Sequence, residues 1–358
     1  MMAGKRLLLG ISNVGAWVLV ALSVLVLMQG ANFEGFTATS VLALGALVLS
    51  LQGIFDFVGG FLLGPTPRPP IHRFFAQWLR GVVLHSLMLG VIAALTLWSY
   101  AQFGTPAVSI VVGSLLLVLI RLPILRWIRG QDFENSYFQG RSLVQLEASD
   151  RGFTGGLSGL RRPYYNVIPR EWQNALDEGA LRAELARRTW QTAKWLPLRS
   201  FVFTTSWNAI GGTWLSEWFG LSQWSGGTLL VGYAAMMTLW GFFGLLSLPS
   251  LGRRSVFAAD QGARIAGRRV EDWIRRAPHI TGEDGNAAAL AQRIFYPIPN
   301  TQERLHRLSD GEKRSWTPLL GCVARENLYF SWATFTWLGR AVHCNCGRPE
   351  LWVFPPNA

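Results

Sequence analysis

Long apolar segments alternate with short polar ones over the first two thirds of the chain. A helix needs about 20 mostly apolar residues to cross a hydrocarbon core of roughly 30 Å. Six segments predict membrane-spanning helices, at about Leu7–Met28, Phe36–Leu63, Gly81–Tyr100, Ala107–Ile120, Leu198–Phe219 and Gly226–Leu248. The expected fold class is therefore an all-α polytopic membrane protein with about six transmembrane helices and a cytoplasmic helical region.

Positive residues between these segments lie on one side only. They comprise Lys5, Arg6, Arg68, Arg73, Arg80, Arg121, Arg126, Arg129, Arg199, Arg253 and Arg254. The opposite loops, residues 30–35, 101–106 and 220–225, contain neither Lys nor Arg. Because positively charged loops stay in the cytoplasm, we expect a bacterial-type inner (plasma) membrane protein with both termini cytoplasmic.

This topology divides the chain into four parts. Residues 1–129 hold four membrane helices, and residues 198–250 hold two more. The polar parts, residues 130–197 and 251–358, are expected to face the cytoplasm.

Composition agrees with a membrane location. Only 15% of the residues are charged and the mean hydropathy is +0.24, whereas soluble domains carry about 25% charged residues. The net charge of +12 follows from the positive loops, so nucleic acid is not an expected partner. The 17 Trp residues suit contact with lipid or with other integral membrane proteins.

The first polar part contains few regular patterns. The glycine- and arginine-rich stretch Arg151–Arg162 predicts a flexible loop, and no phosphate-binding motif is present because no Gly-Lys-Ser/Thr follows. Residues 134–140, ENSYFQG, match a viral protease site often engineered into proteins, and the sequence does not tell whether they are native. From Pro169 the pattern becomes helical, with Asp177 as the expected cap.

Three segments resemble a known family. The stretch LDEGALRAELARRTWQ, Leu176–Gln191, resembles the segment L-s-x-x-E-L-x-A-V-L-A-H-E-x-x-H of the membrane zinc metallopeptidases of the HtpX and CAAX-prenyl-protease type. The stretch Leu251–Ala263 is similar to S-R-x-x-E-x-x-A-D-x-x-A, and Ile298–Leu308 is similar to H-P-x-x-x-x-R-x-x-x-L. The resemblance covers about residues 165–310 and implies a metallopeptidase-like fold.

The residues that the family uses for chemistry are replaced. The resemblance places Arg187 and Gln191 at the two zinc-binding histidines, Arg188 at the catalytic glutamate and Val256 at the third zinc ligand. Arginine offers no lone pair to a metal, and no carboxylate is left to activate water. We therefore expect no zinc, no other cofactor and no peptidase activity, which makes the chain a pseudoenzyme.

One position of the family survives. Asp260 matches the acid that, in the family, orients a zinc-bound histidine. Since Arg187 now stands at that histidine's position, the sequence predicts an Arg187–Asp260 ion pair that replaces the metal as the link between the two segments. The alternative is that both side chains point into water.

The expected function is that of a non-catalytic structural or accessory subunit of a membrane protein complex. Two alternatives stay open. One is an active hydrolase that uses a metal site at His343, Cys344 and Cys346, with Cys322 or His306 as a fourth ligand. The other is a transporter that uses Asp56 and Glu217, which lie in or near predicted spans together with Asn208.

Overall fold

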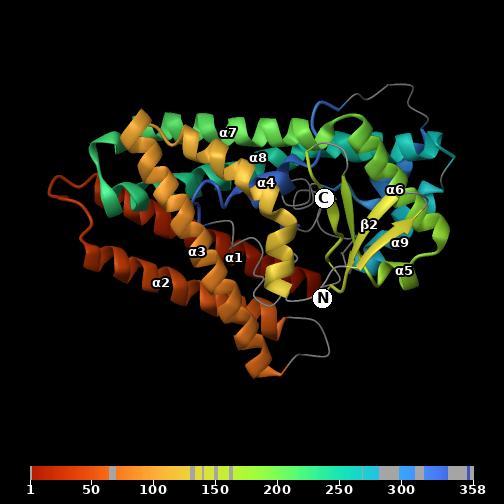
Figure 1. The fold of residues 1–358 in the computed structure, drawn as a ribbon, viewed down its shortest axis with the longest axis horizontal. Coiled ribbons are helices and arrows are strands. Elements are labelled where there is room, and N and C mark those ends of the chain that lie inside the picture. Colours follow the sequence, from red (N-terminus) through yellow and green to blue (C-terminus); the bar gives the residue numbers. More distant parts are fainter. Residues whose placement is uncertain are drawn as a thin grey trace. The chain divides into compact units, whose positions relative to one another are not determined.

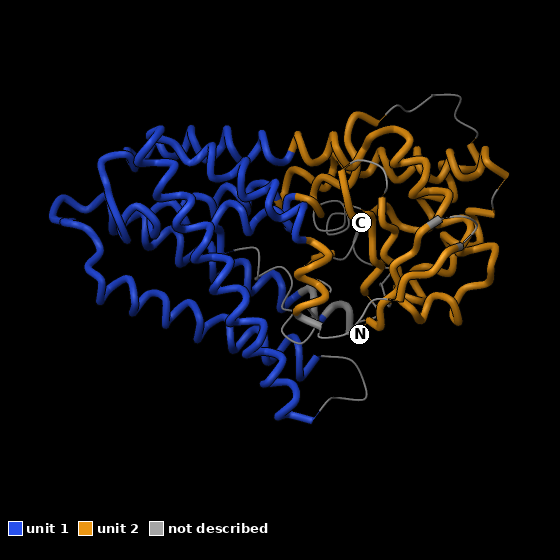
Figure 2. The backbone as a smooth tube through the Cα atoms, viewed as in Figure 1, with its two compact units in different colours: residues 1–120, 204–244, 327–352 blue, residues 121–203, 245–326, 353–358 orange. Residues whose placement is uncertain are grey.

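The computed structural model describes residues 2–63, 70–129, 134–138, 141–148, 152–160, 164–267, 269–281, 298–310, 318–337 and 353–354. The chain forms two compact units, each made of several chain segments (Figure 2). Unit 1 comprises residues 1–120, 204–244 and 327–352. Unit 2 comprises residues 121–203, 245–326 and 353–358.

Unit 1 is built from long helices. Its elements are α1 (Met2–Met28), α2 (Ala38–Phe57), the π-helix η1 (Val58–Leu62), α3 (Ile71–Phe103), the first part of α4 (Ala107–Arg129), the second part of α7 (Leu196–Trp218), the 3-10 helix η2 (Leu221–Gln223) and the first part of α8 (Gly226–Ile265) (Figure 1). Their buried side chains, among them Tyr100, Leu229, Tyr233 and Met236, form one apolar core.

Five helices in the described part of the chain are long and apolar enough to cross a membrane. They are Leu8–Met28, Ala38–Leu62, Ile71–Phe103, Ala107–Trp127 and Gly226–Ile265. These five coincide with five of the six predicted spans. The sixth predicted span, Leu198–Phe219, is helix α7, but its hydroxyl, amide and charged side chains, including Asn208 and Glu217, keep it outside this group.

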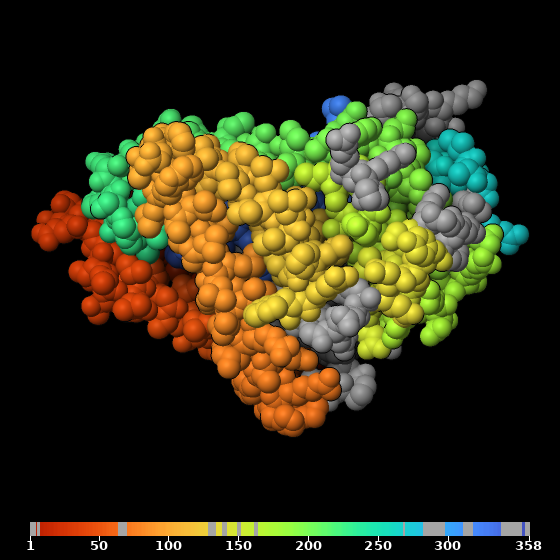
Figure 3. All heavy atoms as spheres, in the orientation of Figure 1, coloured from red at the N-terminus to blue at the C-terminus, as the bar shows by residue number. Residues whose placement is uncertain are grey.

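Burial inside the protein does not explain the apolar character of these helices, because the outer face of α3 is apolar and exposed. Figure 3 shows part of this helix (orange) at the surface of unit 1. Exposed apolar side chains recur every four residues along it, at Ile71, Phe75, Leu79, Val83, Leu87 and Val91. Exposure of a continuous apolar stripe to water is unfavourable, whereas contact with the hydrocarbon of a bilayer is favourable. The protein is therefore an integral membrane protein.

Unit 2 contains a small sheet that the sequence analysis did not anticipate. Strands β1 (Glu134–Phe138), β2 (Arg141–Leu146), β3 (Gly156–Ser158) and β4 (Tyr165–Pro169) lie in the order β1-β2-β4-β3. The β2–β4 pair is parallel and the other two pairs are antiparallel. The fold is thus mainly helical, as predicted, but the stretch expected to be a loop carries β3.

Unit 2 also contains the last part of α4, the first parts of α7 and of α12 (Val323–Phe330), and further helices that pack with this sheet. These further helices are α5 (Trp172–Ala175), α6 (Glu178–Ala193), α9 (Val270–Thr281), α11 (Thr301–Ser309) and the second part of α8. Side chains from the sheet, α5, α6 and α9 form one core, which includes Leu143, Ile168, Trp172, Leu185 and Ile274.

Helix α12 (Val323–Phe330) and the turns that follow it, residues 331–337, carry a run of aromatic side chains. In the described part of this run, Tyr329, Phe330 and Trp332 are buried. The Tyr329 hydroxyl donates a 2.6 Å hydrogen bond to the Leu117 carbonyl within unit 1. This part of the run therefore packs inside its own chain.

Candidate functional site

Helix α6 carries the segment that resembles the zinc-binding helix. It begins after Asp177, whose carboxylate accepts a 2.7 Å hydrogen bond from the backbone N–H of Ala180. The predicted cap is therefore present, and it satisfies one of the free N–H groups of the first turn. The helix is buried on several sides, and its Glu184, Arg187 and Arg188 are all less than a tenth exposed.

The predicted ion pair between Arg187 and Asp260 is present. The Nε of Arg187 on α6 donates to Oδ1 of Asp260 on α8 over 2.6 Å, and Asp260 is only 1% exposed. A terminal guanidinium nitrogen of Arg187 also donates to Glu184, one turn earlier on the same helix. Neither side chain points into water, so the alternative of solvated groups is wrong.

Asp260 binds a second arginine. Nε and Nη2 of Arg304 donate to its two oxygens, each over 2.8 Å. Arg304 lies on α11, which Asn300 caps by accepting a 2.8 Å hydrogen bond from the Glu303 N–H. Asp260 therefore joins α6, α8 and α11, which carry the three segments of the resemblance.

Arg188 ties α6 to the sheet. Its Nε donates to Glu184 over 2.8 Å, and its terminal nitrogens donate to the carbonyls of Val167 and Thr154 over 2.8 Å each. We call Glu184, Arg187, Arg188, Asp260 and Arg304 the ion-pair network. Sequence reasoning missed Glu184 and Arg304 as its members, although Glu184 stands three and four residues before the two arginines, the spacing of helical ion pairs.

The local electrostatics keep the network charged. Burial raises the pKa of Glu184, but the guanidinium groups of Arg187 and Arg188 outweigh burial and hold that pKa below its ordinary value. Burial lowers the pKa of Arg187, but the charges of Asp260 and Glu184 outweigh burial and hold that pKa above its ordinary value. Each buried charge in the network therefore has an opposite charge within hydrogen-bonding distance, which offsets the cost of taking it out of water.

The other two positions that the resemblance aligns with zinc ligands offer little to a metal. Gln191 is half-buried, and Val256 is 2% exposed with an apolar side chain. Zinc sites in proteins use thiolate, imidazole and carboxylate ligands. The guanidinium groups at Arg187 and Arg188 are already engaged with carboxylates, carry positive charge and have no lone pair. The residues at the four family positions do not fit a zinc ion.

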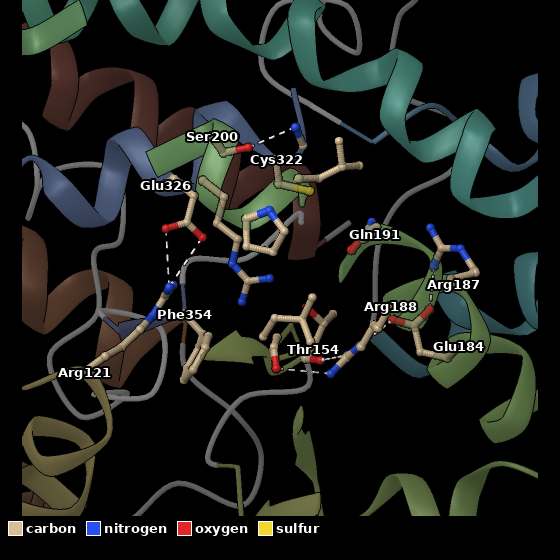
Figure 4. A pocket seen from close by; sticks show the side chains of 16 residues that line it. Arg121, Thr154, Glu184, Arg187, Arg188, Gln191, Ser200, Cys322, Glu326 and Phe354 are labelled. Atoms are coloured by element: carbon tan, nitrogen blue, oxygen red, sulfur yellow. Dashed lines mark hydrogen bonds and ion pairs between the residues drawn. The ribbon is translucent and has the colours of Figure 1, made fainter. Parts of the chain in front are cut away.

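A cavity of about 70 Å³ lies beside the network within unit 2. Its lining residues are Arg121, Thr154, Gly156, Leu157, Glu184, Arg187, Arg188, Gln191, Leu196, Pro197, Ser200, Gly321, Cys322, Arg325, Glu326 and Phe354. We call it the arginine cavity. Figure 4 shows Arg121, Glu326 and Phe354 on one side of it, and Glu184, Arg188 and Gln191 on the other.

Arg121 on α4 and Arg325 on α12 also line the cavity, although the sequence did not link these two helices to the site. Nη1 of Arg121 lies 3.3 Å from Oε2 of Glu326, and its Nε donates to the Val353 carbonyl over 3.1 Å. Arg325 donates from Nη2 to the Gly155 carbonyl. Burial and then the neighbouring Arg121 lower the pKa of Arg325 to about 9, so the side chain is still a cation at neutral pH.

Gly155 explains part of the glycine content of this region. Its φ is +65°, and a Cβ there would lie 1.9 Å from the Val167 carbonyl oxygen. No other residue fits so close to β4 in that conformation. Gly155 thus allows a close crossing of two chain segments in the stretch for which the sequence predicted a flexible loop.

The cysteine and histidine cluster at His343, Cys344 and Cys346 lies outside the described residues. Of its suggested fourth ligands, Cys322 lines the arginine cavity, where burial raises the pKa of its thiol. His306 is exposed and lies 3.2 Å from the Asp310 carboxylate. In the described part of the chain, no group of three or more His, Cys, Asp and Glu side chains could hold a metal ion.

The polar residues proposed for transport have structural partners or face outward. Asp56 accepts hydrogen bonds from Gln52 over 2.8 Å and from Trp78 over 3.1 Å. The Asn208 amide donates to Asn327 over 3.0 Å, and Glu217 is exposed. Asp56 and Asn208 thus hold unit 1 together through buried hydrogen bonds.

Comparison with known proteins identifies the fold. No protein-family model and no curated protein matches this chain in sequence. Among solved structures, the chain is similar to the crystal structure of S. mikatae Ste24p, with a TM-score of 0.59 and 14% identity over 82% of this chain and 80% of that one. Ste24p is a CAAX prenyl protease in the fold family of HtpX. The chain therefore has a Ste24p-like polytopic membrane fold, the fold that the sequence resemblance implied.

Proposed function

We propose that this protein is a non-catalytic relative of the membrane metallopeptidases and acts as a structural or accessory subunit of a membrane protein complex. The observation that carries the proposal is the buried Arg187–Asp260 pair, with Nε and Oδ1 2.6 Å apart. It occupies the place where the family resemblance would put a zinc-bound histidine and the acid that orients it.

The chemistry of peptide hydrolysis supports this proposal. A zinc peptidase needs a metal to polarise the carbonyl and a general base to activate water. Glu184 and Asp260 are the carboxylates of the network, and each bonds two guanidinium groups. A carboxylate held in this way, with its pKa lowered as for Glu184, is a poor base for water.

The proposal also concerns location and partners. The one-sided distribution of Lys and Arg supports a bacterial-type inner membrane with both termini in the cytoplasm. The apolar stripe on α3 offers a surface for lipid or for the helices of other integral membrane proteins. A partner protein that depends on this fold would account for its retention without catalytic groups.

A gentle-detergent purification from the native membrane tests the proposal. We expect a second membrane protein to elute with the chain at a constant ratio across the size-exclusion peak. We also expect no cleavage of prenylated CAAX peptides, even with added zinc. Elution of the chain alone, together with peptide cleavage that a zinc chelator abolishes, would overturn the proposal.

A further inference from the structure

The arginine cavity and the ion-pair network together contain more positive than negative charge. Among the described residues, the two sets taken together contain five arginines and three acids: Arg121, Arg187, Arg188, Arg304 and Arg325 against Glu184, Asp260 and Glu326. Five guanidinium groups against three carboxylates leave a net charge of +2. Backbone carbonyls stabilise some of these cations through their dipoles, but they add no negative charge.

The excess charge concentrates at Arg325. Its side chain is 6% exposed, and its Nε has no hydrogen-bond partner among the described residues. The aromatic ring of Phe354 lies 5.5 Å from its guanidinium carbon and 4.5 Å from that of Arg121. Stacking on one shared ring offsets only part of the cost of burying two cations. A buried donor without a partner is rare in folded proteins and calls for a ligand.

The space fits a small tetrahedral anion. A cavity of about 70 Å³ has room for about five to seven water molecules at 10–15 Å³ each, which is enough for the five heavy atoms of a phosphate group. Gly156 keeps the approach to Arg325 open, since a Cβ there would lie 3.1 Å from both of its terminal nitrogens. Arginine binds phosphate through parallel N–H donors, and a phosphate dianion would neutralise the net charge of +2.

We propose that the arginine cavity binds a phosphate group, with Arg325 as its principal donor and Arg121 as a second cation. The phosphate is either free inorganic phosphate or the terminal phosphate of an anionic lipid headgroup, because both present the same chemistry to the cavity. This site is independent of the proposed accessory role, because neither phosphate binding nor its absence depends on a partner protein.

Isothermal titration of the detergent-purified protein with inorganic phosphate, at constant ionic strength in chloride, tests the site. We expect saturable binding at one site per chain. In R325M, which keeps much of the length of the side chain but removes its charge, affinity should fall at least about tenfold. The matched control is R182M on α6, because Arg182 does not line the arginine cavity and forms an ion pair with Glu178 one turn away, and it should bind phosphate like the wild type.

Thermal unfolding separates a ligand site from a merely structural arginine. Phosphate should raise the midpoint of the wild type and of R182M, but not that of R325M. Without phosphate, R325M should be at least as stable as the wild type, because it no longer buries an unpaired cation. If R325M does not fold, the wild-type titration decides alone, and a lack of saturable phosphate binding there overturns the proposal.

Nanodiscs distinguish the two sources of phosphate. If the headgroup is the ligand, phosphatidic acid should stabilise the wild type more than phosphatidylcholine does, and inorganic phosphate should reduce that difference. If free phosphate is the ligand, the two lipids should act alike while the titration still saturates. Equal responses of wild type and R325M to phosphate in every one of these measurements would contradict the proposal.

Discussion

Arg187 and Asp260 lie 73 residues apart in sequence and join α6 to α8 through a 2.6 Å contact in a fully buried position. Asp260 also holds Arg304 through two further hydrogen bonds. One carboxylate thus connects three helices, and the removal of its charge tests the network.

We expect Asp260→Asn to destabilise the protein strongly. The amide keeps the shape of the side chain but leaves Arg187 and Arg304 without their shared counter-charge, and a buried pair broken on one side costs about 3–5 kcal/mol. Thermal or denaturant unfolding in detergent measures the loss. The matched control is Asp272→Asn, because Asp272 is 46% exposed and lies 4.0 Å from Arg275, and it should change stability by less than about 1 kcal/mol. Equal effects of the two substitutions would contradict the network.

Glu184 predicts a specific pH dependence. Its pKa is held below the ordinary value of 4.5 by Arg187 and Arg188, so its stabilisation is fully present above pH 4.5 and is lost as pH falls through the lowered pKa. The difference in unfolding midpoint between wild type and E184Q should therefore be largest near neutral pH and shrink in acid.

The control for this prediction is E178Q on the same helix. Glu178 is 64% exposed and pairs with Arg182 one turn away, so its substitution should have a small effect at every pH. A difference between wild type and E184Q that stays constant through the acid range would mean that folding does not lower the pKa of Glu184.

A third prediction concerns the packing of α6 against α8. A Cβ at Gly262 would lie 2.1 Å from Cδ1 of Trp190, so Gly262→Ala forces the two helices apart and should cost about 1–3 kcal/mol. Gly90→Ala is the control, since Gly90 is helical and a Cβ there meets nothing within 4 Å. Unfolding midpoints should fall for the first variant only. An unchanged midpoint in G262A would mean that the helices are less tightly packed than described.

The sequence predicted the elements whose signal is local. Five of the predicted apolar spans are helices long and apolar enough to cross a membrane. As predicted, Asp177 caps α6 and Arg187 contacts Asp260. The last of these followed from a resemblance that set two distant segments side by side. Helix α7 was harder to classify, because its apolar residues are interrupted by hydroxyl and amide groups such as that of Asn208.

The rest depended on contacts between residues far apart in the chain. The small sheet was missed because its strands are only three to six residues long, too short for a clear alternating pattern. Arg121 looked like an ordinary loop charge, yet it pairs with Glu326 across 205 residues. No periodicity along the chain reveals that such residues share a cavity with Arg325.

The central claim of the proposed function is that arginine–carboxylate pairs stand at the positions that the sequence resemblance aligns with zinc-binding residues. The most direct test is the zinc content of the purified protein, measured by inductively coupled plasma mass spectrometry after incubation with zinc and removal of the excess. Our account predicts zinc far below one ion per chain, both in the wild type and in D260N. One zinc ion per wild-type chain that is lost in D260N would contradict it.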